Sequence, residues 1–389
     1  MREPRVAYFP DSFHEVNGVA HTSRNFVAYA QRRGLPFLCV RAGMREISFE
    51  QVGELRTLEL RRSRGSVRME KDLEFDTLFW RHGEAIRREL ERFRPDVIHI
   101  TGPSELGMFG AYFAWEMGVP LAASWHTNLH EYAAKRMVWL TGRMAESRAA
   151  IEGGVETGAL WTMSQFYKLA RVLFAPNDEL CRMLERTTGQ SCFLMQRGVD
   201  ADWFSPTHRT RDVNDRTVVL GYVGRLSVEK NVALLAQVER GLAEMGVGGV
   251  RFLIVGHGSE EASLRRNLKD AEFAGVLGGA PLAQAYANMD VLVFPSHTDT
   301  FGNVVLEALA SGVPAVVTPD GGPKFIVRDG ETGFVTVDDH FARTVAELVL
   351  DRPRLQAMRV KAREYALGCS WDAVFDRVYV GYETALRTE

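Results

Sequence analysis

The sequence predicts an α/β protein built from two doubly wound, Rossmann-like domains. Two observations carry this prediction. Short apolar runs alternate with longer amphipathic stretches along most of the 389 residues, and strands that are buried on both faces and separated by helices are typical of a parallel sheet. The alternation is interrupted at residues 205–216, which are polar and turn-rich, and then starts again. We therefore expect two parallel sheets joined by a linker at 205–216.

The first of these domains is expected to contain short buried strands with helices between them. The apolar runs that predict the strands are 6–9, 35–40, 97–100, 121–124 and 172–174. Apolar residues at helical spacing predict helices at 19–33 and 77–94. Near the C-terminus, an aromatic stripe is formed by Trp371, Phe375, Tyr379 and Tyr382. We interpret this stripe as packing and not as a binding site.

The second domain begins after the polar segment and repeats the pattern. Its expected strands are 218–223, 251–255, 276–277, 291–294 and 315–317. Doubly wound sheets bind ligands at the carboxyl ends of their strands. A cleft between two such sheets is therefore the expected site.

Composition excludes several classes of protein. The formal net charge is −3, without the basic excess that nucleic-acid binding usually requires, so no nucleic-acid partner is expected. The four cysteines show no zinc-binding spacing. The N-terminus enters a strand without a signal-peptide apolar region, and no apolar run approaches the roughly 20 residues that span a bilayer. We expect a cytoplasmic protein, soluble or peripheral on the inner face of the membrane.

The most informative motif is the string at residues 296–314, SHTDTFGNVVLEALASGVP. It follows an expected buried strand, and Gly302 should open a helix that ends near Gly312. Glycine lets the backbone approach a ligand closely. The amides of Asn303 and Val304 then lie at a helix N-terminus, which suits an anionic or hydroxyl-rich ligand. Asp299 and Glu307 place two carboxylates beside this turn, and carboxylates accept hydrogen bonds from the vicinal hydroxyls of a sugar or a ribose.

This string resembles the signature of the retaining glycosyltransferases of family 4, the glycosyl transferases group 1, which have the GT-B fold. The resemblance implies two Rossmann-like domains facing a central cleft and transfer of a hexose from a nucleotide-diphosphate sugar. It also implies that Asp299 contacts the donor sugar, that the amides after Gly302 contact sugar hydroxyls or phosphate, and that Glu307 holds the ribose. Asp299 stands where glutamate is commoner in the family, and its side chain is shorter by one methylene.

A second segment, 223–231, comes directly after the first strand of the second domain and carries Arg225 and Lys230. A diphosphate leaving group gains negative charge as its bond to the sugar breaks, so cations here stabilise the transition state more than the ground state. Arginine grips phosphate in a fork, whereas lysine acts as a point charge. The segment resembles the diphosphate-binding segment of the family.

Four further residues are assigned from the resemblance. Gly256 lies in the loop that resembles the nucleotide-side loop, and Arg197 reaches the donor phosphate or sugar. Gly18 begins the first helix and offers its amide to the donor phosphate, and His126 matches a histidine near the donor sugar. The resemblance also implies that 371–389 is a terminal helix returning to the first domain. We therefore expect an acceptor-side domain of 1–205 completed by that helix, and a nucleotide-sugar-binding domain of 206–370.

The sequence lacks an Asp-x-Asp metal motif after a strand and a cluster of histidine and carboxylate ligands. We expect an enzyme that needs no metal or other cofactor, with Arg225 and Lys230 in the place of the cation. No carboxylate is an obvious covalent nucleophile. If anomeric configuration is retained, as the resemblance implies, a front-side mechanism follows, in which the departing phosphate takes the acceptor proton.

Two alternatives stay open, a sugar-nucleotide epimerase on the same fold and a nucleotide-sugar sensor that has no need of His126. A dinucleotide-dependent oxidoreductase is disfavoured because 10–18 lacks Gly-x-Gly-x-x-Gly. The phosphate and ribose contacts do not distinguish UDP from GDP. The motif variants resemble a branch that includes glycolipid synthases and mannosyltransferases, so a lipid or saccharide acceptor is expected. The basic stretch 61–71 is a candidate for peripheral membrane contact.

Overall fold

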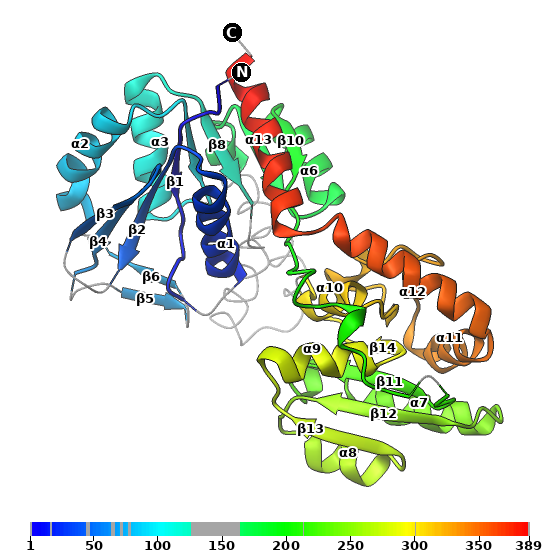
Figure 1. Cartoon of the computed structure of the whole chain (residues 1–389). Helices are drawn as coiled ribbons and strands as arrows, with labels where there is room; N and C mark the ends of the chain where they lie inside the picture. Colours follow the sequence, from blue (N-terminus) through cyan, green and yellow to red (C-terminus); the bar gives the residue numbers. More distant parts are fainter. Residues whose placement is uncertain are drawn as a thin grey trace, which may run out of the picture. The chain divides into compact units, whose positions relative to one another are not determined.

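The computed structural model describes residues 2–15, 18–43, 47–63, 67–70, 73–76, 79–125, 164–212, 214–299 and 301–387. The chain forms two compact units (Figure 1). One consists of Met1–Gln196 together with Trp371–Glu389, and the other of Arg197–Ser370. The chain thus passes from the first unit to the second at 196/197, before the 205/206 boundary expected from the sequence.

The first unit is built on an eight-stranded sheet with the order β10-β9-β8-β7-β1-β2-β4-β3. Its strands are β1 (Val6–Phe9), β2 (Phe37–Gly43), β3 (Ser48–Val52), β4 (Leu55–Arg61), β7 (Val97–Ile100), β8 (Leu121–Ser124), β9 (Val172–Ala175) and β10 (Ser191–Leu194). All pair in parallel except β3 with β4. A separate antiparallel pair is formed by β5 (Val67–Glu70) and β6 (Leu73–Phe75). The five expected strands are confirmed, with β2 starting later and extending further than predicted.

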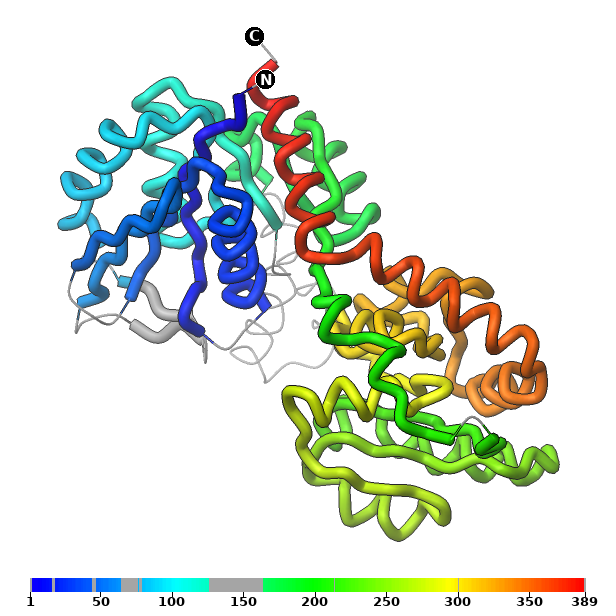
Figure 2. The backbone as a smooth tube through the Cα atoms, viewed as in Figure 1, coloured from blue at the N-terminus to red at the C-terminus, as the bar shows by residue number. Residues whose placement is uncertain are grey.

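Helices cover this sheet, and the last helix of the chain is one of them. They are α1 (Gly18–Arg33), η1 (Phe79–His82), α2 (Gly83–Phe93), α3 (Glu105–Met117), α6 (Asp178–Thr188) and α13 (Trp371–Arg387). Figure 2 shows α13, in red, beside α1, in blue, and Phe375 of α13 stacks on Phe26 of α1 at 4.4 Å between ring centroids. The aromatic stripe of α13 is buried. Its interpretation as packing is therefore confirmed.

The second unit contains a six-stranded, all-parallel sheet with the order β13-β12-β11-β14-β15-β16. The strands are β11 (Val218–Val223), β12 (Val250–Val255), β13 (Ala271–Gly275), β14 (Val291–Phe294), β15 (Ala315–Val317) and β16 (Gly333–Val335). The prediction of a strand at 276–277 is wrong. The strand is β13, an edge strand that is partly exposed along most of its length, so it lacks the continuous apolar run of a central strand.

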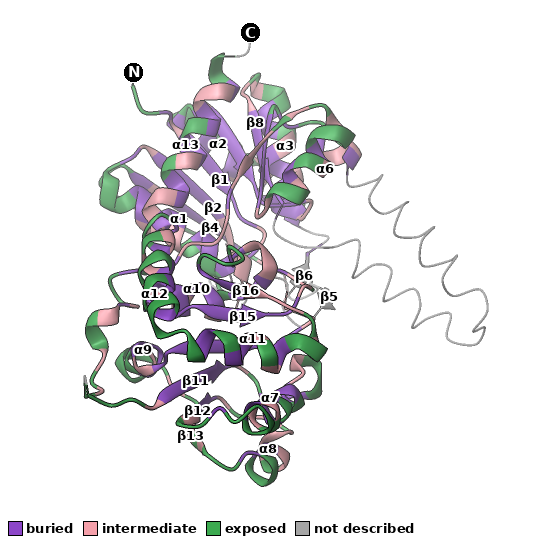
Figure 3. Ribbon diagram, turned by 90° about the vertical axis from the view of Figure 1, so that its right-hand side faces the viewer, coloured by how far each residue is buried: buried purple, intermediate pink, exposed green. Residues whose placement is uncertain are grey.

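The helices of the second unit connect and cover these strands. They are η3 (Pro206–His208), η4 (Val228–Lys230), α7 (Ala233–Glu244), α8 (Glu261–Asn267), α9 (Gly279–Asn288), α10 (Asn303–Ala310), η5 (Pro323–Phe325), α11 (Asp338–Leu350) and α12 (Arg352–Leu367). Figure 3 shows that β11 is buried, while α11 and α12 also present exposed residues. The layers are those of a doubly wound α/β domain.

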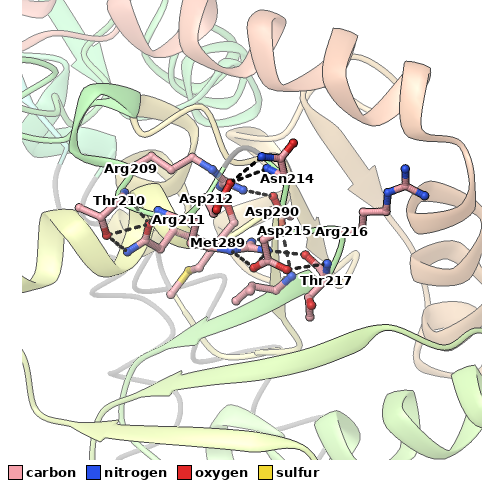
Figure 4. Close-up of polar contacts among 12 residues, drawn as sticks. Arg209, Thr210, Arg211, Asp212, Asn214, Asp215, Arg216, Thr217, Met289 and Asp290 are labelled. Carbon is pink, nitrogen blue, oxygen red and sulfur yellow. Dashed lines mark hydrogen bonds and ion pairs between the residues drawn. The ribbon is translucent and has the colours of Figure 1, made fainter.

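The polar segment 205–216 is not a free linker, because its arginines fasten it to the second unit (Figure 4). Arg209 Nη2 lies 2.8 Å from Asp290 Oδ1, and Arg211 Nη1 lies 2.6 Å from Asp290 Oδ2. The amide of Val219, in β11, donates to the same carboxylate at 2.9 Å. Arg359 of α12 approaches it at 3.4 Å. A buried carboxylate is stable only with such partners, so the segment is a structural part of the unit.

Strand order also identifies where a ligand should bind the second unit. The central strand β11 is flanked by β12 on one side and β14 on the other. The chain continues outward from β11 through β12 and β13 and then returns to build the other half of the sheet from β14, so the strand order reverses at β11. In doubly wound sheets the crevice at this switch point, outside the carboxyl ends of the strands, is the usual ligand site. The segments at that position are those that follow β11 and β14. They contain the two strongest motifs of the sequence.

Candidate functional site

Lys230 and Asp299 meet across the switch point of the second sheet. Lys230 ends η4, after β11, and Asp299 lies in the segment after β14. Lys230 Nζ is 2.7 Å from Asp299 Oδ2, and their side chains are 20% and 25% exposed. Both residues were predicted from separate motifs, and the structure brings them together. A cation and a carboxylate at this position can contact both an anionic group and hydroxyl groups.

The turn before α10 has the geometry expected from the sequence. Gly302 has φ 87° and caps the helix that begins at Asn303. A Cβ atom on Gly302 would lie 2.9 Å from Cγ of Pro323, so both conformation and space favour glycine. Asn303 is exposed and Val304 half-buried. Because the first amides of a helix have no acceptor within the helix, this end of α10 favours a ligand with oxygen acceptors.

Glu307, one turn into α10, is half-buried and hydrogen-bonded. The hydroxyl of Tyr286, in α9, donates to Glu307 Oε2 at 2.8 Å. Burial raises the pKa of Glu307 above its ordinary value, and the bond from Tyr286 partly opposes this. Glu307 is thus held in one position. Tyr286 is fully buried and was not identified from the sequence, because an isolated tyrosine in an amphipathic helix carries no recognisable motif.

Arg225 differs from Lys230 in its surroundings. Its side chain is 71% exposed, and Nη1 lies 3.3 Å from Glu229 of η4. The structure therefore brings Lys230, but not Arg225, into an ion pair with Asp299. Arg225 remains on the segment that follows β11, where a change of side-chain rotamer alone alters its reach.

Arg197 belongs to the second unit and lies near the same carboxylate. Its guanidinium carbon is 5.4 Å from the ring centroid of Phe301. Burial lowers the pKa of Arg197, and the charge of Asp299 acts in the opposite direction. Arg197 was predicted as a donor contact in the first domain. Its place in Arg197–Ser370 puts it in the same unit as Asp299.

Backbone packing alone explains why position 256 is a glycine, without a role in ligand binding. Gly256 has φ 135°, and a Cβ atom there would lie 1.9 Å from the carbonyl oxygen of Gly224. Next to it, the amide of Leu226 donates to the carbonyl of His257 at 3.1 Å. The loops after β11 and β12 thus pack backbone against backbone. This contact requires glycine at 256 and fixes the segment that carries Lys230.

A polar cluster beside Lys230 and Asp299 was missed by the sequence analysis. His297 Nδ1 is 2.8 Å from Asp320 Oδ2, and His297 Nε2 is 3.2 Å from Asp338 Oδ2. Asn231 Nδ2 donates to the same Asp338 oxygen at 2.9 Å. Burial lowers the pKa of His297, but the two carboxylates outweigh it and the net shift is upward. These residues come from four segments of the chain, so only the folded structure unites them.

Of the two site residues predicted in the first domain, the structure describes Gly18 but not His126. Gly18 opens α1, as expected. His126 lies outside the described residues, as does part of the basic stretch 61–71. Within the described part of the chain, no group of three or more His, Cys, Asp or Glu residues is arranged to hold a metal ion. None of the described helices is long and apolar enough to cross a membrane.

Comparisons with known proteins agree with this arrangement. A family model described as Glycosyltransferase Family 4 matches residues 16–203, and one described as Glycosyl transferases group 1 matches 217–351. A GDP-mannose-dependent alpha-mannosyltransferase of Mycobacterium tuberculosis is 33% identical over 305 residues, covering 76% of this chain and 75% of the relative. The protein of that name from Corynebacterium glutamicum is 28% identical over 393 residues, covering 98% and 89%.

Among solved structures, sucrose-phosphate synthase from Thermosynechococcus elongatus matches over the full length of both chains, with a TM-score of 0.66 and 18% sequence identity. This likeness confirms the predicted fold class, GT-B. The sequence matches confirm the family expected from the string at 296–314. The chain belongs to glycosyltransferase family 4, the glycosyl transferases group 1, and is a glycosyltransferase.

Proposed function

We propose that this glycosyltransferase transfers a hexose, with retention of configuration, from a nucleotide-diphosphate sugar to a lipid or saccharide acceptor, and that its donor is GDP-mannose. The choice of donor is supported by the two relatives above, which are named as GDP-mannose-dependent mannosyltransferases. One of them aligns with 98% of this chain. The acceptor class rests on the motif variants alone.

The observation that carries the proposal is the pairing of Lys230 with Asp299 beside the N-terminus of α10. In the proposed complex, Lys230 contacts the donor diphosphate, and the amides of Asn303 and Val304 contact phosphate or sugar oxygens. Asp299 accepts hydrogen bonds from hydroxyls of the donor sugar. Its contact with Lys230 at 2.7 Å holds this carboxylate in place.

Glu307 is the proposed partner of the ribose. Its hydrogen bond from Tyr286 uses Oε2, which leaves acceptor capacity on the carboxylate for the vicinal hydroxyls of a nucleoside. A carboxylate that is already oriented loses little side-chain entropy when the ribose binds. This assignment concerns the nucleoside part of the donor and does not distinguish guanosine from uridine.

The proposed chemistry is a front-side displacement. The bond between the anomeric carbon and the phosphate oxygen breaks, the acceptor oxygen bonds to that carbon on the same face, and the acceptor proton passes to the departing phosphate. Lys230 stabilises the charge that develops on this phosphate. Arg225 is proposed to join it by exchanging its contact with Glu229 for a phosphate oxygen. In this scheme no metal or other cofactor is needed.

The proposal is tested by donor binding and turnover. Calorimetric titration with GDP-mannose, GDP-glucose and UDP-glucose should give a submicromolar to micromolar dissociation constant for GDP-mannose alone, and the same donor should raise the melting temperature by mass action. Release of GDP in the presence of EDTA tests independence from metal, and the one-bond coupling between C1 and H1 of the transferred mannose tests retention. Binding of UDP-glucose in place of GDP-mannose contradicts the choice of donor, and failure to bind any of the three nucleotide sugars contradicts the whole proposal.

Turnover separates the enzyme from a sensor on the same fold. A sensor binds the donor without consuming it, whereas the enzyme releases GDP when acceptor is supplied. Replacement of His126 by alanine sharpens this distinction, because the proposed role of His126 concerns the sugar. We expect this variant to bind GDP and lose turnover.

A further inference from the structure

The proposed chemistry does not use the cluster around His297, although two of its residues lie close to Lys230 and Asp299 in the sequence. Asn231 follows Lys230, and His297 precedes Asp299 by two residues. The hydroxyl of Thr298 also donates to the carbonyl of Glu229 at 3.1 Å. Three sets of contacts therefore join the segments after β11 and β14. They are the hydrogen bond of Thr298, the Lys230–Asp299 ion pair and the contacts of the His297 cluster.

Asn231 has an unusual backbone conformation. Its φ is 52°, in the left-handed region that non-glycine residues seldom adopt. Its side-chain amide lies 2.9 Å from Asp338 Oδ2 and 3.2 Å from His297 Nε2. Because the residue before it is Lys230, a change in this turn redirects the lysine. The hydrogen bonds of the Asn231 side chain thus bear on the direction of the Lys230 side chain.

The contacts of His297 depend on its protonation. When both ring nitrogens carry protons, Nδ1 donates to Asp320 and Nε2 donates to Asp338, so the imidazolium bridges two carboxylates. When Nε2 is unprotonated, it can no longer donate to Asp338 Oδ2, 3.2 Å away, and accepts from Asn231 Nδ2 at 3.2 Å instead, so the bridge between the two carboxylates is broken. The charged groups that bear on His297 are Asp320 after β15 and Asp338 at the start of α11.

We propose that His297 is a positioning residue for donor binding: its imidazolium joins Asp320 to Asp338 and, through the amide of Asn231, holds Lys230 against Asp299. This inference rests on the proposed function, because it assumes that Lys230 contacts the donor diphosphate. His297 itself touches neither donor nor acceptor. Its effect is to fix the segment that carries the cation before the donor arrives.

The proposal makes donor affinity depend on pH in a stated direction. The folded-state pKa of His297 is raised above its ordinary value of 6.5, so the bridge is complete below that value and is lost as the pH rises through the raised pKa. GDP-mannose is a suitable probe because its diphosphate is a diester and does not titrate in this range. Its affinity for the wild-type protein should therefore weaken on the alkaline side.

The experiment compares the wild type with His297→Gln, His297→Ala and Asp338→Asn by calorimetric titration with GDP-mannose from pH 6 to 8.5. We expect His297→Ala and Asp338→Asn to weaken binding at pH 6 on the order of tenfold. His297→Gln, which keeps one donor, should bind with intermediate affinity and without the alkaline limb. The control is His208→Ala, since His208 is exposed in η3, and this variant should behave as the wild type.

The outcomes are distinct. If His297→Gln keeps the wild-type affinity and pH profile, the proposal is overturned. If His297→Ala does not fold, the wild-type profile still decides, because affinity that stays constant from pH 6 to 8.5 contradicts the proposal. If the wild type binds neither GDP-mannose nor UDP-glucose, it is the proposed function that fails, and the inference fails with it.

Discussion

Tyr286 and Glu307 form a 2.8 Å hydrogen bond between α9 and α10, and this bond orients the carboxylate that we assign to the ribose. The tyrosine is fully buried and the glutamate half-buried. The bond connects the helix that precedes β14 to the helix that follows it. A contact outside the sequence motif thus controls a residue inside it.

Tyr286→Phe tests this relationship. Loss of the hydroxyl removes the hydrogen bond that opposes the effect of burial, so the pKa of Glu307 should rise further. Less of the carboxylate is then ionised at mildly acidic pH, and the affinity for GDP should fall about fivefold to tenfold, with the loss greatest on the acid side. Calorimetry across pH measures this. Tyr112→Phe is the control, since its bond to Glu116 is exposed. Equal affinity and equal pH dependence in Tyr286→Phe and the wild type would remove Tyr286 from the site.

Lys230→Ala should separate catalysis from stability. We expect kcat/KM to fall on the order of 100-fold, because a cation at the leaving phosphate acts mainly in the transition state. The free energy of unfolding should change by less than about 1 kcal/mol, because the pair with Asp299 is partly exposed. Steady-state kinetics and urea denaturation give the two values. The exposed Lys269 supplies the control variant, Lys269→Ala, and similar kinetics in the two variants count against a role for Lys230.

Asp290→Ala should have the opposite result, a large loss of stability. The change removes the carboxylate shared by Arg209, Arg211 and Arg359, and breaking a buried ion pair costs about 3–5 kcal/mol. Urea denaturation measures this, with the exposed Asp212→Ala as the control. Donor affinity, measured under conditions where the variant is folded, should not change, because Asp290 precedes β14 and the site follows it. If Asp290→Ala lowers the free energy of unfolding no more than Asp212→Ala does, the ion pairs with Asp290 do not stabilise segment 205–216.

The lowered pKa of Asp290 should make the stability of the protein depend on pH. Burial alone would raise the pKa of Asp290, but its hydrogen bonds from Val219 and the arginines outweigh burial and hold the pKa below its ordinary value. A lowered folded-state pKa gives stability that is present above the unfolded value, about 3.9, and is lost as the pH falls through the folded value. The difference in unfolding free energy between the wild type and Asp290→Asn should therefore shrink as the pH is lowered through this window.

Gly256→Ala tests the backbone contact between the loops after β11 and β12. Its Cβ atom would meet the carbonyl oxygen of Gly224 at 1.9 Å, in a conformation that also disfavours alanine. We expect a loss of about 1–3 kcal/mol in unfolding free energy and weaker donor binding. Gly278→Ala is the matched control, because no atom lies within 4 Å of the position that its new methyl group would occupy. If the two substitutions cost the same, the contact is not what requires glycine at 256.

Elements whose formation depends on their own apolar residues could be predicted from the sequence. β1 and β7 have the predicted bounds because all four residues of each strand are buried, and only His99 of β7 interrupts their apolar sequence. β13 was misplaced because it lies at an edge and is only partly buried. The segment at 205–216 was taken for a linker because the partner of its arginines, Asp290, is distant in the sequence.

The residues of the candidate site also fall into two groups, those that a local motif predicts and those that depend on distant partners. Asp299, Gly302 and Glu307 lie in one string, and their spacing around a helix start could be recognised locally. Tyr286 and His297 act through pairing with residues of other segments, which no local pattern reveals. The resemblance to the family implies that Lys230 and Asp299 both serve the donor, but only the order of the strands places the two residues together.

The return of α13 to the first unit has a consequence for how the protein is made. During synthesis the residues of the second unit leave the ribosome before Trp371–Arg387. Until those residues emerge, Tyr8 and Phe174 on one face of the first sheet, and Phe26 of α1 beside them, lack the helix that covers them. The second unit can therefore complete its core while the nascent first unit still exposes aromatic surface. A chain that stalls or is truncated before residue 371 should be a preferred client of chaperones, although every residue of its second unit is already present.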